Sequence, residues 1–193
     1  MKKVGLLGGT FNPLHIGHLM MANEAFHILG LDEVRFMPNA IPPHKQFDGV
    51  ATNEQRIAMV EQAIADIPYF YIELIEFERT GKSYTFDTIE LLRQREPDVA
   101  FYFIIGGDMI DSLHTWHRID ELVQSVQFVG VKRPNMKNDT IYPVLMIDTP
   151  EIYLSSSFIR QRLATNGTVR FLLPQSVETY IRKEGLYGAT TIT

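Results

Sequence analysis

The sequence predicts an α/β fold with a doubly wound parallel sheet, helices on both of its faces and a small helical part towards the C-terminal end. Two observations support this prediction. Short apolar runs alternate with amphipathic stretches of about 10–15 residues, which is the pattern of βαβ units. The apolar runs are continuous rather than alternating, as expected for strands covered on both faces. In such sheets the ligand binds at the carboxyl ends of the strands, where the strand order switches.

The first elements are a strand, a helix and a second strand. The apolar run Val4–Leu7 ends at a glycine pair, which predicts a buried strand followed by a tight turn. In Ile16–Leu29 apolar residues recur at helical spacing, and the following Gly30 is a typical C-cap. Residues 33–39, EVRFMPN, predict a strand that is broken by Pro38.

The middle of the chain continues this alternation. Asn53–Ile67 is an amphipathic helix with Thr52 as its expected N-cap. Residues 69–77, YFYIELIEF, alternate like a strand, and residues 83–95, SYTFDTIELLRQR, form a helix with a polar start. Val99–Asp108 is a strongly apolar strand that again ends in a glycine pair and a polar residue.

The last third predicts two further strands and two closing helices. The strands are expected at Gln127–Lys132 and Val144–Ile147, and the helices at Ser156–Thr165 and Gln175–Lys183. The chain contains no internal repeat, linker or low-complexity segment. We therefore expect residues 1–193 to form a single Rossmann-like domain.

Composition excludes several classes of function. The formal charge of −5 argues against a broad nucleic-acid-binding face, although it allows a local cationic pocket. The absence of cysteine removes disulfides, thiolate zinc sites and a cysteine nucleophile. No segment approaches the roughly 18 apolar residues that cross a bilayer, and the apolar run at the N-terminus is too short for a signal peptide. We expect a cytoplasmic protein with no membrane contact.

The stretch GGTFNPLHIGH, Gly8 to His18, carries the most specific chemistry. It matches neither the GxxxxGK[ST] loop nor the GxGxxG dinucleotide fingerprint. His15 and His18 are three apart at a helix start, so both rings can lie on the same side, and Gly17 removes a side chain that would block close approach. A metal site, a proton-transfer pair and an anion cradle all remain open. A metal site lacks an obvious third ligand nearby.

This stretch resembles the signature of the nucleotidylyltransferase superfamily, GxFxPxHxGH. The second signature of that superfamily, ISSTxIR, is matched by LSSSFIR at residues 154–160. Within the superfamily the whole chain is similar to the bacterial nicotinate mononucleotide adenylyltransferases, through the segments PNAIPPHK, GKSYTFDT and GGDMIDSLHTWHR. The departures are small: Leu154, Ser157 and Asn12 stand where Ile, Thr and Asp are commoner.

The resemblance implies transfer of the adenylyl group of ATP to nicotinate mononucleotide, with release of pyrophosphate. The nucleophile is an ionised phosphate oxygen, so no general base is needed, and the transition state requires in-line positioning and neutralisation of charge. His18, His15 and Thr10 are the expected catalytic residues, with His18 on the transferred phosphoryl group. Magnesium is expected to be held mainly through the ATP phosphates. A homodimer is a further expectation from the family.

By the same resemblance, two sets of residues bind the substrates. The ATP-binding residues lie in the two signatures and at the end of the fourth long strand: Gly8, Gly9, Thr10, His15, His18, Gly106, Asp108, Ser155, Ser156, Ile159 and Arg160. Those for the mononucleotide are Asn39, His44, Lys45, Tyr84, Thr85, Trp116, His117 and Arg133.

Several of these assignments have ordinary structural alternatives. Ser155 or Ser156 caps a helix, and Asp108 is equally suited to a helix start. Tyr84 and Thr85 begin a helix whose N–H groups favour the nicotinate carboxylate, while Asp87 is expected to cap that helix. Trp116 either stacks on the pyridine ring or belongs to the core, and Lys45 is either a phosphate ligand or a solvated loop lysine.

Three other functions compete with this assignment. Class I aminoacyl-tRNA synthetases also carry HIGH, but the chain has no KMSKS match and neither the length nor the charge for tRNA. Other small adenylyltransferases act on nicotinamide mononucleotide or on phosphopantetheine. A nucleotide-binding module without activity would tolerate loss of His18 and keep its affinity, whereas an enzyme would lose turnover.

Overall fold

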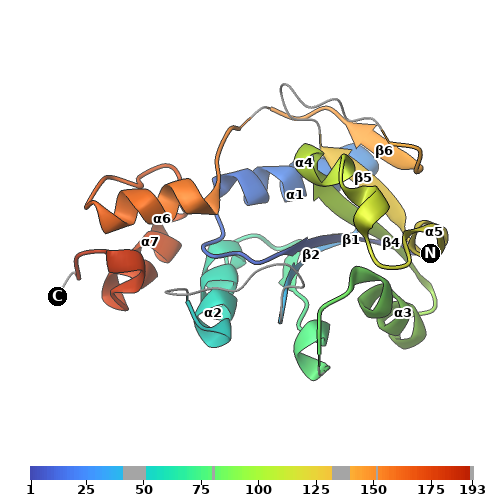
Figure 1. Cartoon of the computed structure of the whole chain (residues 1–193), viewed down its shortest axis with the longest axis horizontal. Coiled ribbons are helices and arrows are strands. Elements are labelled where there is room, and N and C mark those ends of the chain that lie inside the picture. The colour runs from blue at the N-terminus through green and yellow to red at the C-terminus, as the bar shows by residue number, and fades with distance from the viewer. Residues whose placement is uncertain (41–50, 80, 132–139, 151, 192–193) are drawn as a thin grey trace.

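The computed structural model describes residues 1–40, 51–79, 81–131, 140–150 and 152–191. Within these ranges, six parallel strands form one sheet in the order β3-β2-β1-β4-β5-β6 (Figure 1). The chain builds outward from β1 to β3, then returns beside β1 with β4 and continues to the other edge. This order confirms the predicted doubly wound sheet. The strands are β1 (Lys2–Gly9), β2 (Glu33–Pro38), β3 (Phe70–Ile72), β4 (Val99–Gly106), β5 (Gln127–Val131) and β6 (Val144–Ile147).

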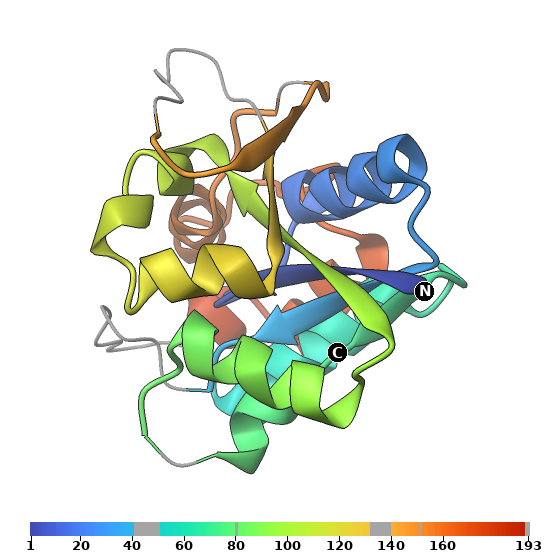
Figure 2. The ribbon, with the colours of Figure 1, turned by 90° about the vertical axis from the view of Figure 1, so that its right-hand side faces the viewer.

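Helices lie between the consecutive strands from β1 to β5 and cover both faces of the sheet; Figure 2 shows α1 and α3 on opposite sides of the strands. The longer helices are α1 (Ile16–Leu29), α2 (Asn53–Ile64), α3 (Thr85–Arg95), α5 (Ile119–Ser125), α6 (Ser156–Ala164) and α7 (Gln175–Lys183). A single turn, α4 (Gly107–Ile110), follows β4, and short 3₁₀ helices lie at Ile75–Glu78, Leu113–Thr115 and Leu186–Gly188. Among the described residues, no helix combines the length and apolar character of a membrane span.

The central strand β4 contributes to two separate apolar clusters because its side chains alternate between the faces. Ile104 belongs to the cluster that includes α1, α2, α6 and α7. Phe103 and Ile105 belong to the cluster that includes α3 and α5. Both faces of the strand are therefore buried, which explains why the sequence of β4 is apolar without alternation.

The predicted small C-terminal helical part consists of α6 and α7, at the left of Figure 1. Val177 and Ile181 of α7 are fully buried in the cluster shared with α2. The hydroxyl of Ser176 also donates to the backbone carbonyl of Gln62 at 2.9 Å. This helical part is thus joined to one face of the sheet by apolar packing.

Three local predictions about helix ends are confirmed. Gly30 adopts the left-handed conformation, with φ of 57°, at the end of α1. The Thr52 side chain accepts from the backbone N–H of Gln55 at the start of α2. Ser155 caps α6 by accepting from the N–H of Phe158 at 3.3 Å. Each cap depends on neighbouring residues alone, so the local sequence is sufficient to predict it.

Two predictions about elements are wrong, and one helix was missed. The strand expected over residues 69–77 is β3 alone, because the chain turns after Glu73, whose carboxylate accepts from the N–H of Ile75 at 3.1 Å. The helix expected to reach Ile67 ends at Ile64, shortly before Pro68, which disfavours a helical residue in front of it. Helix α5 was not predicted at all; it spans only seven residues.

Candidate active site

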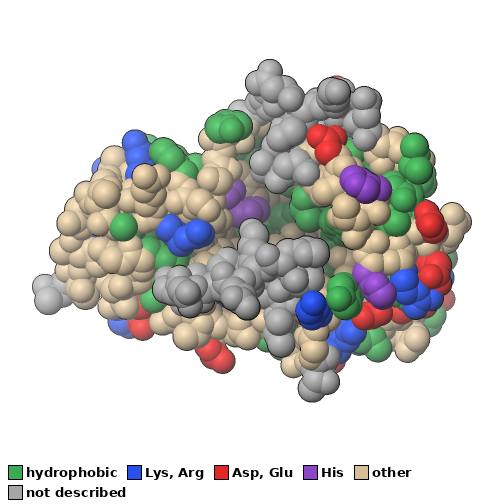
Figure 3. Space-filling model, viewed as in Figure 1, with side chains coloured by type: hydrophobic (Ala, Val, Ile, Leu, Met, Phe, Trp, Pro, Cys, Tyr) green, Lys and Arg blue, Asp and Glu red, His purple; other side chains and the backbone are tan. Residues whose placement is uncertain are grey.

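A cavity of about 260 Å³ lies at the carboxyl ends of β1 and β4, where the strand order switches. Figure 3 shows the corresponding face of the molecule hollowed at its centre, with histidine side chains inside the hollow. Many of the residues predicted for the site meet here. They are Gly8, Gly9, Thr10, His18, Asn39, Thr85, Gly106 and Trp116.

The two signature histidines are in direct contact. His15 is the N-cap of α1, and the imidazole rings of His15 and His18 are stacked with centroids 3.7 Å apart. His18 lines the cavity, whereas His15 is buried with 4% of its surface exposed. The predicted placement of both rings on one side is therefore correct, but only His18 lines the cavity wall.

The tautomer of His18 follows from its hydrogen bond to the backbone. The N–H of His15 donates to Nδ1 of His18 at 3.2 Å. Because Nδ1 accepts this bond, the proton of the neutral ring is on Nε2. The edge-to-face contact with Phe11, at a centroid distance of 5.2 Å, further orients the ring. His18 is thus a fixed N–H donor in the cavity wall, a group suited to an anion.

Gly17 is required by the close approach of the His15 ring. A Cβ at Gly17 would lie 3.1 Å from Nδ1 of His15 and 3.2 Å from its Cε1, closer than most carbon contacts. The sequence analysis expected Gly17 to remove a side chain that would block close approach. The structure shows that it makes room for His15, and so it acts on the histidine pair rather than on the cavity directly.

The second signature contacts the loop at residues 10–13, which belongs to the first signature. The Ser156 hydroxyl donates to the carbonyl of Pro13 at 2.9 Å, and Nη1 of Arg160 donates to the carbonyl of Asn12 at 2.8 Å. Nη2 of Arg160 donates to the Ser157 hydroxyl at 3.1 Å. Two segments that are distant in sequence therefore form one structural unit.

The four second-signature residues predicted to bind ATP make structural contacts outside the cavity lining. Ile159 is fully buried in the apolar cluster, and Ser155 is occupied as the cap of α6. Ser156 and Arg160 bind the loop carbonyls. None of these four side chains is among the residues that line the described cavity. Their contact with ATP stays a prediction.

A third connection to the loop comes from near the C-terminal end. The phenol of Tyr187 donates to Oδ1 of Asn12 at 2.5 Å. Burial raises the pKa of Tyr187, so the phenol stays protonated and remains a donor. Asn12 is 2% exposed, and its amide nitrogen has no hydrogen-bond partner among the described residues.

Of the residues predicted for the nicotinate group, Thr85 and Trp116 line the cavity, whereas Tyr84 and His117 are not among its lining residues. Thr85 begins α3 and lines the cavity, and Tyr84 precedes it as the N-cap. The rings of Tyr84 and His117 pack against each other with centroids 4.5 Å apart. Trp116 lines the cavity. It also packs edge-on against Phe103, with centroids 6.0 Å apart, so it serves the core and the cavity together.

Some predicted residues lie outside the described part of the chain. These are His44, Lys45 and Arg133, together with the side chain of Asp108, whose backbone belongs to α4. The prediction that Asp87 caps α3 is wrong. Its carboxylate forms an ion pair with Arg79 at 3.0 Å, and Tyr84 occupies the cap position without a side-chain bond.

Glu76 lines the cavity and was missed by the sequence analysis. It is 3% exposed, and burial raises the pKa of its carboxyl group. Hydrogen bonds from Ser83, Thr88 and the backbone N–H of Ala40 partly oppose this rise. The sequence analysis placed Glu76 in a strand that ends before this position. Nothing in the local sequence marked its carboxyl group as part of a site.

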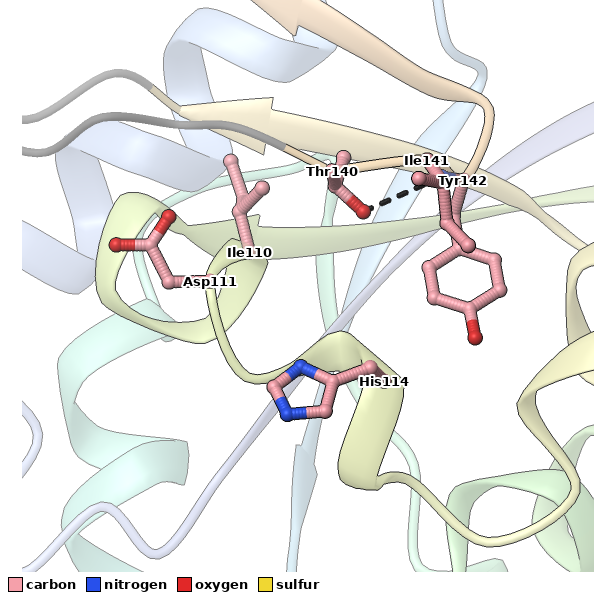
Figure 4. Close-up of a pocket in the computed structure, with 6 residues that line it drawn as sticks. All are labelled: Ile110, Asp111, His114, Thr140, Ile141 and Tyr142. Atoms are coloured by element: carbon pink, nitrogen blue, oxygen red, sulfur yellow. Dashed lines mark hydrogen bonds between the residues drawn. The ribbon is translucent and has the colours of Figure 1, made fainter.

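A second cavity lies beside α4, and Figure 4 shows its lining, which comes from residues 110–114 and from residues 140–142 before β6. The hydroxyl of Thr140 accepts from the backbone N–H of Tyr142 at 3.2 Å. None of the residues predicted for the site lines it. Separately, no group of three or more His, Cys, Asp or Glu in the described ranges is arranged to hold a metal ion.

Comparison with known proteins gives the same assignment throughout the chain. The cytidylyltransferase-like family profile matches residues 6–162. A probable nicotinate-nucleotide adenylyltransferase of Geobacillus thermodenitrificans is 52% identical over 191 residues, covering 99% of this chain and 88% of the relative. The nicotinate-nucleotide adenylyltransferase of Bacillus subtilis is 49% identical over 187 residues, covering 97% and 99%.

The chain belongs to the nicotinate-nucleotide adenylyltransferases, within the cytidylyltransferase-like family. The resemblance stated from its two signatures is therefore correct. A solved structure with the same fold is the nicotinic acid mononucleotide adenylyltransferase of Plasmodium falciparum in complex with NaAD. It has a TM-score of 0.83 at 21% identity and covers 97% of this chain and 98% of that chain. In this adenylyltransferase family member, the cavity at the switch point of the sheet is the candidate active site.

Proposed function

We propose that this chain transfers the adenylyl group of ATP to nicotinate mononucleotide. An ionised phosphate oxygen of the mononucleotide attacks the α-phosphorus, and the bond between the α-phosphorus and the bridging oxygen to the β-phosphate breaks. The products are nicotinate adenine dinucleotide and pyrophosphate, and no proton has to move in this step. The curated relatives carry this activity in their names.

The residues of the cavity suit this reaction because they position groups and stabilise charge. His18 offers a fixed N–H donor at the cavity wall, aimed by its bond to the backbone of His15. Donors that are oriented before the reaction stabilise charge as it develops on the phosphates. The N-terminal end of α1 adds a partial positive charge at the same place. His15 then acts by holding His18.

Magnesium is proposed to enter the site on the ATP phosphates. This ion usually keeps several waters and is bound through substrate phosphates and one or two carboxylates. It would neutralise charge on the triphosphate and on the departing pyrophosphate. The homodimer and the cytoplasmic location also stay predictions.

The single observation that carries the proposal is that both signature segments form one unit beside a cavity that also contains Thr85 and Trp116. The cavity thus brings together residues assigned to both substrates. The test is pyrophosphate release with ATP and magnesium, comparing nicotinate mononucleotide, nicotinamide mononucleotide and phosphopantetheine. A clear preference for nicotinate mononucleotide is expected. Preference for either other acceptor would overturn the assignment.

A further inference from the structure

The peptide unit between Asn39 and Ala40 is held from both sides by the buried side chains of Arg56 and Glu76. Its carbonyl accepts from Nη2 of Arg56 at 2.5 Å, and its N–H donates to Oε2 of Glu76 at 3.3 Å. Arg56 and Glu76 are each 3% exposed. Because Asn39 and Glu76 both line the cavity, the orientation of this peptide determines part of the cavity wall.

Arg56 also contacts the end of β1, the strand beside β2. Its Nη1 donates to the carbonyl of Thr10 at 2.7 Å, and Nη2 donates to Oδ1 of Asn53 at 2.6 Å. Thr10 directly follows β1 and Asn39 directly follows β2. The same guanidinium thus joins two cavity-lining segments that belong to adjacent strands.

The burial of Arg56 is energetically costly, as is any burial of a charge without full compensation. Desolvation lowers the pKa of Arg56 from its ordinary value. Among the described residues its hydrogen bonds go to two backbone carbonyls in the cavity wall and to the Asn53 side chain, and none goes to a carboxylate. The planar guanidinium of Arg56 holds several acceptors in a set geometry. By binding these two carbonyls, it orders this part of the cavity wall.

We propose that Arg56 and Glu76 are positioning residues for adenylyl transfer, which align the Thr10 side of the cavity with the Asn39 side by fixing the Asn39–Ala40 peptide. This inference rests on the proposed function, since Thr10 and Asn39 belong to the walls assigned to ATP and to the mononucleotide. Neither Arg56 nor Glu76 has to touch a reacting atom. Their effect is on the distance and angle between the two substrates.

The first test compares Arg56→Lys with Asn53→Ala. Lysine keeps the positive charge and the long stem, but its single ammonium cannot reproduce the planar fork. Asn53→Ala removes one acceptor of the same guanidinium and leaves the bonds to Thr10 and Asn39 in place. We expect Arg56→Lys to lower kcat/KM for the mononucleotide by about 10- to 100-fold, the cost of a small misplacement of reacting groups. Asn53→Ala should stay within about twofold of the wild type.

The second test acts on the other side of the peptide. In Glu76→Gln the amide oxygen can still accept from the N–H of Ala40, whereas Glu76→Ala leaves that N–H without its acceptor. We expect Glu76→Gln to keep most of the activity and Glu76→Ala to lose about tenfold in kcat/KM. The two Glu76 variants test the positioning role even if an Arg56 variant fails to fold.

A binding readout separates this inference from the proposed function. Trp116 is the only tryptophan of the chain and lines the same cavity, so its fluorescence reports ligand binding. Nicotinate mononucleotide and ATP are titrated separately into each variant, and melting temperatures check folding. Wild-type protein that releases no pyrophosphate would overturn the proposed function. Active wild type with Arg56→Lys unchanged, or with Asn53→Ala equally impaired, would overturn the positioning role.

Discussion

The hydroxyl of Ser156 donates to the carbonyl of Pro13 at 2.9 Å, a bond between residues 143 positions apart in the chain. It connects the start of α6 with the loop that precedes His15. Because Pro13 lies two residues before His15, any shift of this loop moves the N-terminal end of α1. The second signature therefore acts in part by holding the first signature in place.

Ser156→Ala should lower kcat/KM by about tenfold and the free energy of unfolding by about 1 kcal/mol, the usual value of one such bond. The matched control is Ser176→Ala. Its hydroxyl makes the same kind of bond, to Gln62, but away from the cavity. Urea denaturation and pyrophosphate release measure both effects. Equal loss of activity in the two variants would contradict a role for Ser156 in the site.

Tyr187→Phe should destabilise the protein by about 1–3 kcal/mol, because it removes the hydroxyl that donates to the buried amide of Asn12. Activity should fall as well, since Asn12 belongs to the first signature. Tyr71→Phe is the control: it removes an exposed hydroxyl bonded to the carbonyl of Pro68. Thermal melting and steady-state kinetics distinguish the two. A Tyr187→Phe protein that is as stable and active as Tyr71→Phe would show that the hydrogen bond between Tyr187 and Asn12 has no such role.

His18→Ala should reduce kcat by about 10²- to 10³-fold, the cost of removing one oriented donor. The affinity for ATP should change far less, because the donor matters most as charge develops. Single-turnover kinetics measure the rate, and Trp116 fluorescence measures binding. Near-normal turnover would refute the phosphoryl role of His18. ATP affinity that survives in His18→Ala, in a protein whose wild type releases no pyrophosphate, would favour a binding module over an enzyme.

Glu96 should make the free energy of unfolding depend on pH in the acidic range. Nη1 and Nη2 of Arg35 donate to its two carboxylate oxygens at 2.6 and 2.8 Å, and this pair lowers the pKa of Glu96 from 4.5 to about 2. A carboxyl group whose pKa is lower in the folded than in the unfolded protein stabilises the fold at pH values above its unfolded-state pKa. This stabilisation is lost as the pH falls through the folded-state pKa.

The stabilising contribution of Glu96 is therefore complete above pH 4.5 and disappears between pH 4.5 and about 2. The difference in unfolding free energy between the wild type and Glu96→Gln should be largest at neutral pH and should shrink over this range. Urea denaturation at several pH values measures it. A difference that stays constant down to the lowest pH would show that Glu96 does not titrate in this way.

The amino-acid sequence by itself determined the fold class, most strands and helices, and the ends marked by Gly30, Thr52 and Ser155. These features depend on periodicity and on capping bonds between near neighbours, which local sequence carries. It also indicated His15 and His18, since their spacing at a helix start places both rings on one side. The expected function came from the resemblance of the two signatures and three further segments to a known family.

Only the tertiary structure decided which of these residues meet, because that depends on how distant elements pack. It placed His18 in the cavity wall and His15 behind it. It also brought Arg56 from the first turn of α2, and Glu76 from a segment assigned to a strand, to opposite sides of one peptide. A buried charge on an amphipathic helix has the same local pattern as a solvated one. Its partners are set by the folded chain.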